Sequence, residues 1–441
     1  MDKDKVSKIV SLTKRRGFIF PSSEIYGGFG SSYDFGPLGV EMKKNIKDIW
    51  WKEMTQNQND VVGLDAAILM NPKVWEASGH LKGFTDELVE CKQCKKRFKE
   101  GEIQKGKCPE CGGEITESRK FNLMMKTFVG PVEDEASVAY MRAETCQGIY
   151  VNFENVRQSM RKKLPFGIAQ IGKSFRNEIN PKNFIFRTRE FEQMEMQWFC
   201  EPKNADKWFE FWKEQRINWY LGLGIKKSNL RAFEVPEGDR AHYAKRQVDL
   251  EYKFPWGWGE IEGIHNRGEW DLSNHAKSSG KDLKYFNEET KEKYFPWIIE
   301  TSVGVERSLF AFLIESYQEI EGGRTETTES AKEKEVVLKI NKQLAPIKVA
   351  VLPLVKNKPK IVEKAQEIYE DIKKDFVSAY DQTGTIGRRY RRMDEVGVIK
   401  SITIDFDTLE DEMVTIRDRD TMKQERIKIK NLKNILQEEL N

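Results

Sequence analysis

The chain has 441 residues, of which 39% are hydrophobic, and this length predicts two or three globular domains rather than one. The 74 lysine and arginine residues nearly balance the 71 aspartate and glutamate residues, which argues against a general attraction to nucleic acid or to membranes. The start of the chain, MDKDKVSKIVSLTKRRGF, is too charged for a secretory signal, and no run of about 18 apolar residues occurs. We therefore expect a cytoplasmic protein without a membrane partner.

A long helix followed by a strand is expected near the N-terminus. Apolar residues recur at helical spacing in GPLGVEMKKNIKDIWWKEMTQ, residues 36–56, after a Pro-Gly turn signal. The next apolar stretch, VVGLDAAILMNP at 61–72, is predicted to be a strand that ends at Pro72.

Four of the six cysteines form two CxxC knuckles in CKQCKKRFKEGEIQKGKCPEC. Each knuckle presents two thiolates from one tight turn, and together they complete the tetrahedral set that zinc prefers, with no open position for catalysis. We predict a structural Zn²⁺ site, the alternative being a ribbon without metal. Its ligands are Cys91, Cys94, Cys108 and Cys111. Cys146 and Cys200 stand alone and are assigned no role.

Residues 164–200 are expected to form an antiparallel hairpin with a turn signal, NPKN, in its middle. The segment GIAQIGKS at 167–174 matches the phosphate-loop pattern G-x-x-x-x-G-K-[ST]. A true phosphate loop follows a buried strand and opens a helix whose N-terminus faces the phosphates. Here RKKLPF is a poor buried strand, and only six residues separate Ser174 from Pro181. We therefore do not expect a phosphate loop.

The charged residues of this hairpin suggest a different way to hold a nucleotide. Arg176 and Glu178 alternate within the first predicted strand, and Arg187 and Phe191 are four residues apart on the second, so each pair is expected to share one face. Guanidinium groups suit phosphate, a phenyl ring suits stacking on a purine, and a carboxylate suits an amine or Mg²⁺. The set indicates a site for a nucleotide plus an amine. The alternative is a solvent-facing hairpin with cross-strand salt bridges.

The rest of the chain alternates helices and strands. KNADKWFEFWKEQRINWYLGLG at 203–224 is predicted to be an amphipathic helix whose tryptophans pack in the core, and 296–317 to pass from strand through glycine into helix. The polar run that follows is a predicted linker or solvated excursion. From about residue 346, strand and helix patterns alternate again, which favours a separate α/β domain.

A basic cluster occurs within this last region, in GRRYRRMDE. It places Arg388, Arg389, Arg391 and Arg392 around Tyr390. Arginine beside an aromatic ring suits a phosphate backbone and an unstacked base, although a solvated basic turn is the alternative.

The chain resembles the class II aminoacyl-tRNA synthetases, and among them the dimeric glycyl-tRNA synthetases, over nearly its whole length. The resemblance is carried by SSYDFGPLG, NPKVWEASGH, MRAETCQGIYVNF, FRNEINPKNFIFRTREFEQME, WGEIEGIHNR, IETSVGVERSLFAFL and IGRRYRRMDEVG. It implies an α+β fold with a class II antiparallel β-sheet catalytic core flanked by helices at 1–318. It also implies a zinc-ribbon insertion at 85–120, a linker or solvated excursion at 319–345 and a C-terminal α/β anticodon-binding domain at 346–441. The helix and strand ending at Pro72 would form the interface of a homodimer.

The resemblance also implies an activity and its residues. The chain would join glycine to ATP, with Mg²⁺ on the phosphates, and pass the glycyl group to the 3′ end of tRNA(Gly). Arg176, Glu178 and Arg307 would be catalytic. The implied ATP contacts are Arg176, Asn177, Glu178, Phe186, Arg187, Phe191, Glu260, Ile261, Gly304 and Arg307. The implied glycine contacts are Arg97, Glu144, Phe191, Gln193, Glu195, Glu300 and Ser302.

Within this resemblance, Arg176 would hold the α-phosphate and Arg187 would reach the γ-phosphate. Phe191 and Arg307 would stack on opposite faces of adenine, and Glu260 would act through Mg²⁺. The glycine-site carboxylates would bind the ammonium group. A pocket for an absent side chain excludes larger amino acids by crowding, so no editing domain is expected.

Three other functions remain as alternatives. One is a synthetase-like protein that has lost catalysis, although the three arginines of the implied nucleotide site are present. Another is a zinc-ribbon protein that binds nucleic acid without catalysis. The third is a class II synthetase for threonine, proline or histidine, against which YDFGPLG and WGEIEG favour glycine. The four histidines are scattered, and none is expected to be a general base. They are His80, His242, His265 and His275.

Overall fold

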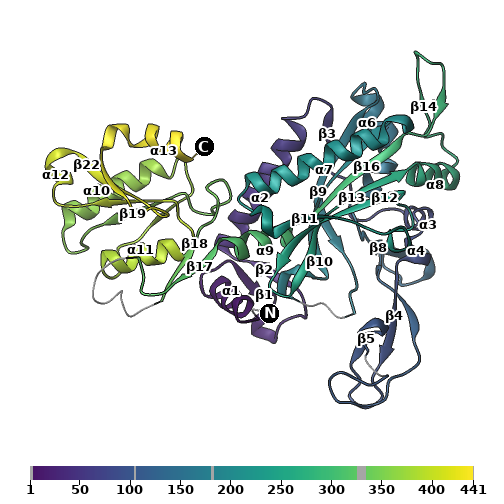
Figure 1. The fold of residues 1–441 in the computed structure, drawn as a ribbon, viewed down its shortest axis with the longest axis horizontal. Helices are drawn as coiled ribbons and strands as arrows, with labels where there is room; N and C mark the ends of the chain where they lie inside the picture. The colour runs from purple at the N-terminus through teal and green to yellow at the C-terminus, as the bar shows by residue number, and fades with distance from the viewer. Residues whose placement is uncertain (1–2, 104–105, 180–182, 325–333, 441) are drawn as a thin grey trace.

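The computed structural model describes residues 3–103, 106–179, 183–324 and 334–440 (Figure 1). Its largest element is a seven-stranded sheet in the order β11-β12-β13-β16-β10-β9-β3, in which β3 pairs parallel with β9 and the other neighbours pair antiparallel. The strands are β3 (Val61–Gly63), β9 (Phe166–Phe175), β10 (Glu190–Cys200), β11 (Leu230–Glu234), β12 (Arg246–Phe254), β13 (Gly257–Gly268) and β16 (Trp297–Gly304). A largely antiparallel sheet flanked by helices is the architecture that the resemblance implies.

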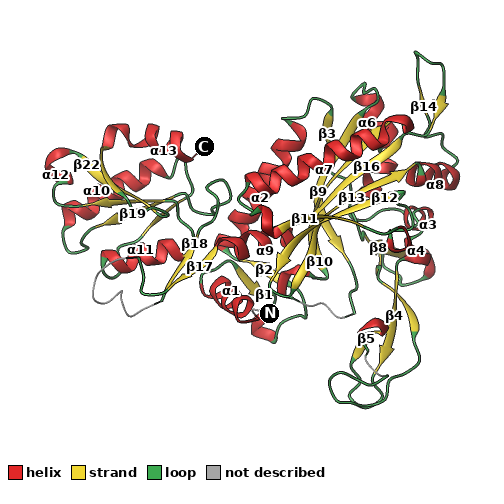
Figure 2. Ribbon diagram, viewed as in Figure 1, coloured by secondary structure: helices red, strands yellow, loops and turns green. Residues whose placement is uncertain are grey.

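The two faces of this sheet differ because side chains alternate along each strand. In β10, Met194, Met196 and Trp198 lie in the main hydrophobic core, whereas Gln193 and Glu195 face the other side and line a cavity. Three helices pack against the apolar face (Figure 2). They are α2 (Pro37–Thr55), α7 (Ala205–Gly222) and α9 (Val305–Ser316). The predicted helices at 36–56 and 203–224 and the strand-to-helix passage near residue 300 are therefore confirmed.

Smaller elements surround the opposite face and the N-terminus. A second core cluster packs helices α5 and α8 against the far end of the same sheet. The helices are α1 (Lys3–Arg15), α3 (Lys73–Ala77), α4 (His80–Gly83), α5 (Cys146–Val151), α6 (Phe153–Ser159) and α8 (Trp270–Ser279). The strands are β1 (Ile19–Pro21), β2 (Tyr33–Phe35), β7 (Met125–Phe128), β8 (Val138–Met141), β14 (Tyr285–Phe286) and β15 (Lys293–Tyr294).

The hairpin predicted at 164–200 is present as β9 and β10, with Phe191 opposite Ser174. The segment 167–174 lies inside β9, hydrogen-bonded to β10 and, at its start, to β3, so it is not a phosphate loop. The prediction that Arg176, Glu178 and Arg187 lie on these strands is wrong. The ladder stops because the N–H of Asn177 donates to the carbonyl of Leu123 instead of to the hairpin partner.

Beyond β9, Arg176 and Glu178 therefore lie in the connection, and Arg187 follows a short 3-10 turn, Phe184–Phe186. Residues 180–182 of the NPKN turn signal lie outside the described residues, and Asn183 is in the left-handed region with φ of 64°.

The strand predicted at 61–72 is shorter than expected and spans only Val61–Gly63. Side chains form hydrogen bonds with backbone groups that a longer strand would use for pairing. The N–H of Ala66 donates to Gln170 Oε1 at 2.7 Å, and Arg142 Nη1 donates to the carbonyl of Ala66 at 2.7 Å.

A three-stranded sheet carries the four cysteines and projects from the catalytic body (Figure 1). Its strands are β4 (Thr85–Glu90), β5 (Arg97–Lys99) and β6 (Arg119–Asn122). The described part of the insertion has a small core of its own around Val89 and Phe98. The three strands lie between residues 85 and 122.

The C-terminal region is an α/β domain with the strand order β20-β19-β21-β22-β23, as expected from about residue 346. Its strands are β19 (Val349–Pro353), β20 (Ser378–Tyr380), β21 (Lys400–Ile404), β22 (Met413–Asp418) and β23 (Gln424–Lys428). Its helices are α10 (Pro359–Ile372), α11 (Ile386–Glu395), α12 (Thr408–Asp411) and α13 (Leu432–Leu440). No helix within the described ranges is long and apolar enough to cross a membrane.

The predicted linker at 319–345 is in part an ordered hairpin. Strand β17 (Tyr317–Ile320) pairs with β18 (Glu335–Leu338), and β18 packs against α11. Arg324 stabilises this arrangement, since its Nη2 donates to Glu335 Oε1 at 2.9 Å and to Asp394 Oδ2 at 2.5 Å. Residues 325–333 of the polar run lie outside the described residues.

The basic cluster on α11 is only partly available to a ligand. Arg389 is 1% exposed and donates to the carbonyls of Pro353 and Leu354, so its role is to hold the domain together. The Tyr390 ring lies 4.7 Å from the guanidinium of Arg417. Arg388 is exposed at the start of the helix. Arg389 is therefore not available to nucleic acid, whereas Arg388 is.

Candidate active site

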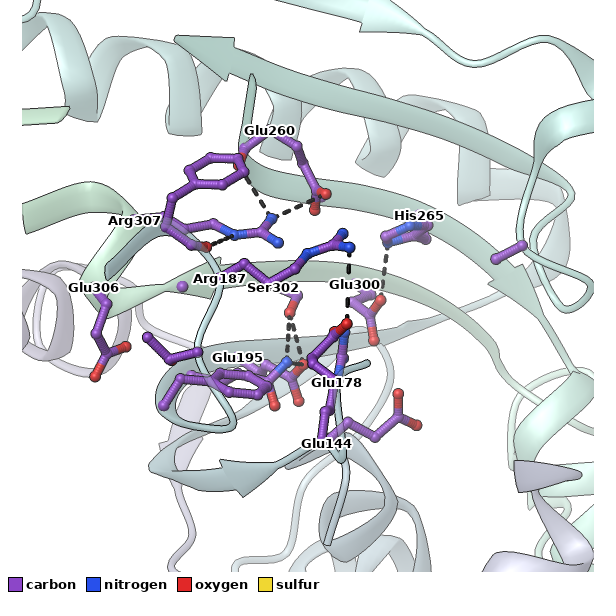
Figure 3. Close-up of a pocket in the computed structure, with 18 of the residues that line it drawn as sticks. Glu144, Glu178, Arg187, Glu195, Glu260, His265, Glu300, Ser302, Glu306 and Arg307 are labelled. Carbon is purple, nitrogen blue, oxygen red and sulfur yellow. Dashed lines mark hydrogen bonds and ion pairs between the residues drawn. The ribbon is translucent and has the colours of Figure 1, made fainter. Parts of the chain in front are cut away.

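A cavity of about 250 Å³ opens on the polar face of the seven-stranded sheet (Figure 3). Strands β10, β13 and β16 form its floor, and the connection after β9 and the start of α9 form its sides. Its described lining comprises Glu144, Arg176, Glu178, Ile185, Phe186, Arg187, Thr188, Phe191, Gln193, Glu195, Ala241, Tyr243, Gln247, Glu260, Gly263, His265, Glu300, Ser302, Gly304, Glu306 and Arg307.

At one end of the cavity, Arg307 is held flat by its neighbours. Its Nη1 donates to Glu260 Oε2 at 3.0 Å and its Nε to the carbonyl of Phe186 at 3.1 Å (Figure 3). The guanidinium carbon lies 4.7 Å from the centroid of the Phe186 ring. A planar cation fixed in this way presents a face on which a purine can stack.

On the facing side, Arg176 lies between two rings. Its guanidinium carbon is 5.2 Å from the Phe191 ring and 5.3 Å from the Phe84 ring, and its Nε donates to the carbonyl of Ala143 at 3.2 Å. These contacts orient the guanidinium while leaving its terminal nitrogens for an anionic ligand.

Glu178 lies at the mouth of the cavity between two cations. Its Oε2 is 3.7 Å from Arg187 Nη1 and 3.7 Å from Lys99 Nζ, and this buried oxygen accepts no hydrogen bond among the described side chains. Lys99 comes from the cysteine insertion, so the insertion reaches the edge of the site.

The opposite end of the cavity is acidic. Glu144 precedes α5, Glu195 lies on β10 and Glu300 lies on β16, and all three carboxylates are buried. Ser302 Oγ donates to Glu195 Oε1 at 2.6 Å, and Gln193 Nε2 donates to the same oxygen at 3.0 Å. Figure 3 shows Ser302, Glu300 and Glu144 near Glu195.

Basic side chains outside the predicted set face Glu300 and Glu144. Glu300 lies 3.0 Å from Arg267 Nη1 and 2.9 Å from His265 Nδ1, and Glu144 lies 3.4 Å from His80 Nε2. Arg267 and His265 belong to β13 and His80 to α4. The sequence analysis missed these residues, although the alternating polar residues of IEGIHNR in a predicted catalytic stretch were a usable signal.

The three carboxylates differ in ionisation because their surroundings differ. Burial raises the pKa of Glu195 to about 8, and the charges of Glu300 and Glu144 add to the effect. Burial also works to raise the pKa of Glu300, but Arg267 and His265 outweigh it and lower that pKa to about 2. For Glu144, His80 and Arg267 outweigh burial and hold the pKa well below its ordinary value. Glu195 is thus the carboxylate that stays protonated at neutral pH, and a cation bound beside it would favour its ionised form.

Most of the sequence-predicted residues meet in this cavity, and three do not. Ile261 is buried beside Glu260, and Asn177 makes a backbone contact behind the cavity. Arg97 lies on β5 of the insertion, where its side chain is 63% exposed and its Nε donates to Glu90 Oε2 at 3.1 Å. The structure does not bring Arg97 to the acidic end of the cavity.

The four predicted zinc ligands lie together in the insertion, with all four sulfurs within 4.8 Å of one another. The Sγ atoms of Cys91 and Cys111 are 3.5 Å apart, and those of Cys94 and Cys108 are 3.6 Å apart. A tetrahedral site with Zn–S bonds of about 2.3 Å requires sulfurs about 3.8 Å apart, so this set fits Zn²⁺.

Comparison with known proteins gives two family matches and close relatives. Residues 131–317 match the tRNA synthetase class II core domain (G, H, P, S and T), and residues 348–439 match the anticodon binding domain. Glycine--tRNA ligase from Treponema denticola is 52% identical over 97% of this chain and 96% of its own length. Glycine--tRNA ligases from Streptomyces coelicolor and Thermobifida fusca are 48% and 49% identical, each over 99% of this chain and 98% of the relative. The chain therefore belongs to the glycine--tRNA ligase family of class II aminoacyl-tRNA synthetases.

Proposed function

We propose that the cavity on the polar face of the sheet is where this glycine--tRNA ligase joins glycine to ATP and then charges tRNA(Gly). One observation carries the assignment: a single cavity joins oriented arginines and aromatic rings to a group of buried carboxylates. The first set suits a nucleotide and the second suits an ammonium group, and their adjacency suits a reaction between ATP and a small amino acid.

In the proposed reaction, a carboxylate oxygen of glycine attacks the α-phosphorus of ATP. The bond from that phosphorus to the bridging oxygen breaks, and pyrophosphate leaves. A terminal ribose hydroxyl of the tRNA then attacks the glycyl carbonyl carbon, and AMP leaves. Neither step needs a side-chain nucleophile, so catalysis rests on positioning and on charge stabilisation.

For ATP, we assign the adenine to the gap between Phe191 and Arg307, and call these two side chains the adenine walls. In this assignment Arg176 contacts the α-phosphate and Arg187 the γ-phosphate. Glu260 carries the proposed Mg²⁺ contact, since its half-exposed carboxylate offers the oxygen ligand that this ion prefers. Mg²⁺, when bound, neutralises charge on the phosphates. The remaining proposed contacts near the nucleotide are Asn177, Glu178, Phe186, Ile261 and Gly304.

For glycine, we assign the ammonium group to Glu144, Glu195 and Glu300, with Gln193 and Ser302 orienting Glu195. The ammonium would favour the ionised form of Glu195 and lie beside Glu144 and Glu300. Larger amino acids would be excluded by crowding, because a site for an absent side chain has no contact to gain from one.

Further properties belong to the same proposal. The four cysteines hold a structural Zn²⁺, and residues 346–441 bind the anticodon through exposed groups such as Arg388. Strand β3 is an edge strand, and α2 leads into it, so this region is the proposed interface of a homodimer. The proposed location is the cytoplasm.

Paired arginine variants test the assignment. Arg176→Ala should lower glycine-dependent ATP–pyrophosphate exchange by about 100- to 1000-fold, because it removes one donor from the developing phosphate charge. Arg388→Ala is the matched control: it should leave exchange unchanged and weaken tRNA charging. Near-normal exchange by a folded R176A protein would refute the nucleotide site. Equal loss of both activities in R388A would refute the separate anticodon-binding role.

A further inference from the structure

A buried lysine lies behind the proposed nucleotide site. Lys43 of α2 is 8% exposed, and its Nζ lies 2.6 Å from Glu306 Oε1 and 2.7 Å from Glu192 Oε2. Nζ also lies 4.1 Å from the centroid of the Phe35 ring. Burial works to lower the pKa of Lys43, but the two carboxylates outweigh it and raise that pKa above its ordinary value. Lys43 is therefore a charged group enclosed by protein.

The two carboxylates belong to the chain neighbours of the adenine walls. Glu192 follows Phe191 in β10, and Glu306 precedes Arg307 in α9. Pairing of β10 with β16 ends at Gln193 and Gly304, so Phe191 and Arg307 both lie beyond the last paired residues of these two strands. At that point Glu306 Oε2 accepts a hydrogen bond from the N–H of Glu192 at 2.9 Å. Figure 3 shows Glu306 and Arg307 with their side chains directed apart.

We propose that Lys43 is a positioning residue for ATP. Its charge holds Glu192 and Glu306 together and thereby sets the gap between the adenine walls. Without a cation between them, the two carboxylates would repel each other in a poorly solvated place, and the start of α9 would move relative to β10. This inference rests on the proposed function, because it requires that adenine stack between those walls.

The test is Lys43→Met, assayed by glycine-dependent ATP–pyrophosphate exchange with each substrate varied in turn. The KM for ATP should rise by about 10- to 100-fold, since small displacements at a reacting site have effects of this size. The KM for glycine should stay within about twofold. A loss of folded enzyme alone would change neither KM. Such a split between the two KM values is not expected from a residue that only stabilises the fold.

Two neighbouring lysines on α2 provide matched controls. Lys47 Nζ contacts Glu192 Oε1 at 3.0 Å and, in the part of the chain that the structure describes, makes no ion pair with Glu306, so Lys47→Met should change the KM for ATP by about threefold at most. Lys44 is exposed, and Lys44→Met should change neither KM. A K44M effect as large as that of K43M would overturn the proposal.

Arg307→Ala, measured in parallel, distinguishes a wrong role for Lys43 from a wrong nucleotide site. If R307A raises the KM for ATP and K43M does not, the role of Lys43 is wrong while the nucleotide site stands. If R307A leaves the KM for ATP unchanged, the assigned nucleotide site is wrong, and the positioning role of Lys43 is then wrong as well. Equal increases in both KM values for K43M would also overturn the positioning role.

Glu192→Gln covers the case in which K43M does not fold, as judged by circular dichroism. It leaves Lys43 paired with Glu306 and removes one of the two ion pairs. The KM for ATP should then rise by about 3- to 10-fold with the KM for glycine unchanged, and an unchanged KM for ATP would overturn the proposal.

Discussion

Glycine binding is expected to release a proton, because Glu195 and Glu300 share a buried site that ionises only once at neutral pH. Glu300 has a pKa of about 2 and Glu195 of about 8. At pH 7 a group with a pKa of about 8 is protonated in roughly nine-tenths of molecules. The ammonium group of glycine favours the ionised carboxylate, so binding at pH 7 should release about 0.9 proton.

The direction of the pH dependence follows from the same shift. Below pH 8 the site must lose a proton before it can pair with the ammonium, so apparent glycine affinity should rise by about ninefold from pH 6 to 7 and by about fivefold from pH 7 to 8. Above about pH 8 it should level off. The kcat/KM for glycine at saturating ATP should follow this profile.

Calorimetry in buffers of different protonation enthalpy measures the released proton directly. Glu195→Gln cannot ionise, so it should release no proton and show a flat profile, with glycine affinity lowered by about 10- to 100-fold through loss of a charge-assisted contact. Glu144→Gln is the matched control: it removes a carboxylate whose pKa lies well below neutral, so it should weaken glycine binding at every pH and keep the slope. A flat wild-type profile with no proton released would refute the reasoning, since Glu195 would then be ionised before glycine arrives.

Two further predictions concern metal and stability. Cys108→Ser should abolish binding of one Zn²⁺ per chain, measured by elemental analysis. The insertion should become sensitive to protease while the melting temperature of the catalytic core changes little, because the insertion has its own small core. A zinc content equal to that of the wild type would contradict the site. Arg216→Met should lower the free energy of unfolding by about 3–5 kcal/mol, because Glu262, which is 0% exposed and 2.6 Å from Arg216 Nε, loses its ion-pair partner. Urea unfolding measures that change, and the double variant R216M/E262Q should recover part of it; no loss of stability in R216M would show that the buried pair contributes little.

Local features of this protein could be predicted from the sequence because they depend on spacing within a short segment. Two CxxC knuckles bring four sulfurs together whatever surrounds them, and the structure places those sulfurs within 4.8 Å. The β9–β10 hairpin and helices α2 and α7 follow from apolar periodicity and turn residues. The phosphate-loop match could be rejected for the same reason, since its flanks lacked a strand followed by a helix.

The ends of strands were predicted less well from the sequence, because they depend on hydrogen bonds between backbone groups and residues far away in the chain. Strand β9 ends because Asn177 bonds to Leu123, and the segment after β3 leaves the sheet because Gln170 and Arg142 bond to Ala66. Arg389 looks like its basic neighbours in the sequence, yet its guanidinium is used up by backbone carbonyls inside the domain.

The sequence by itself determined the cysteine knuckles, the hairpin and the residue types of the proposed nucleotide site. The family resemblance named Glu144, Glu195 and Glu300, but only the tertiary structure brings them together, through pairing of β10 with β16 and packing of α5 against β10. Their ionisation depends on Arg267 and His265 of a third strand, and no spacing along the chain predicts it. Burial and charge act through space, and the fold sets the distances over which they act.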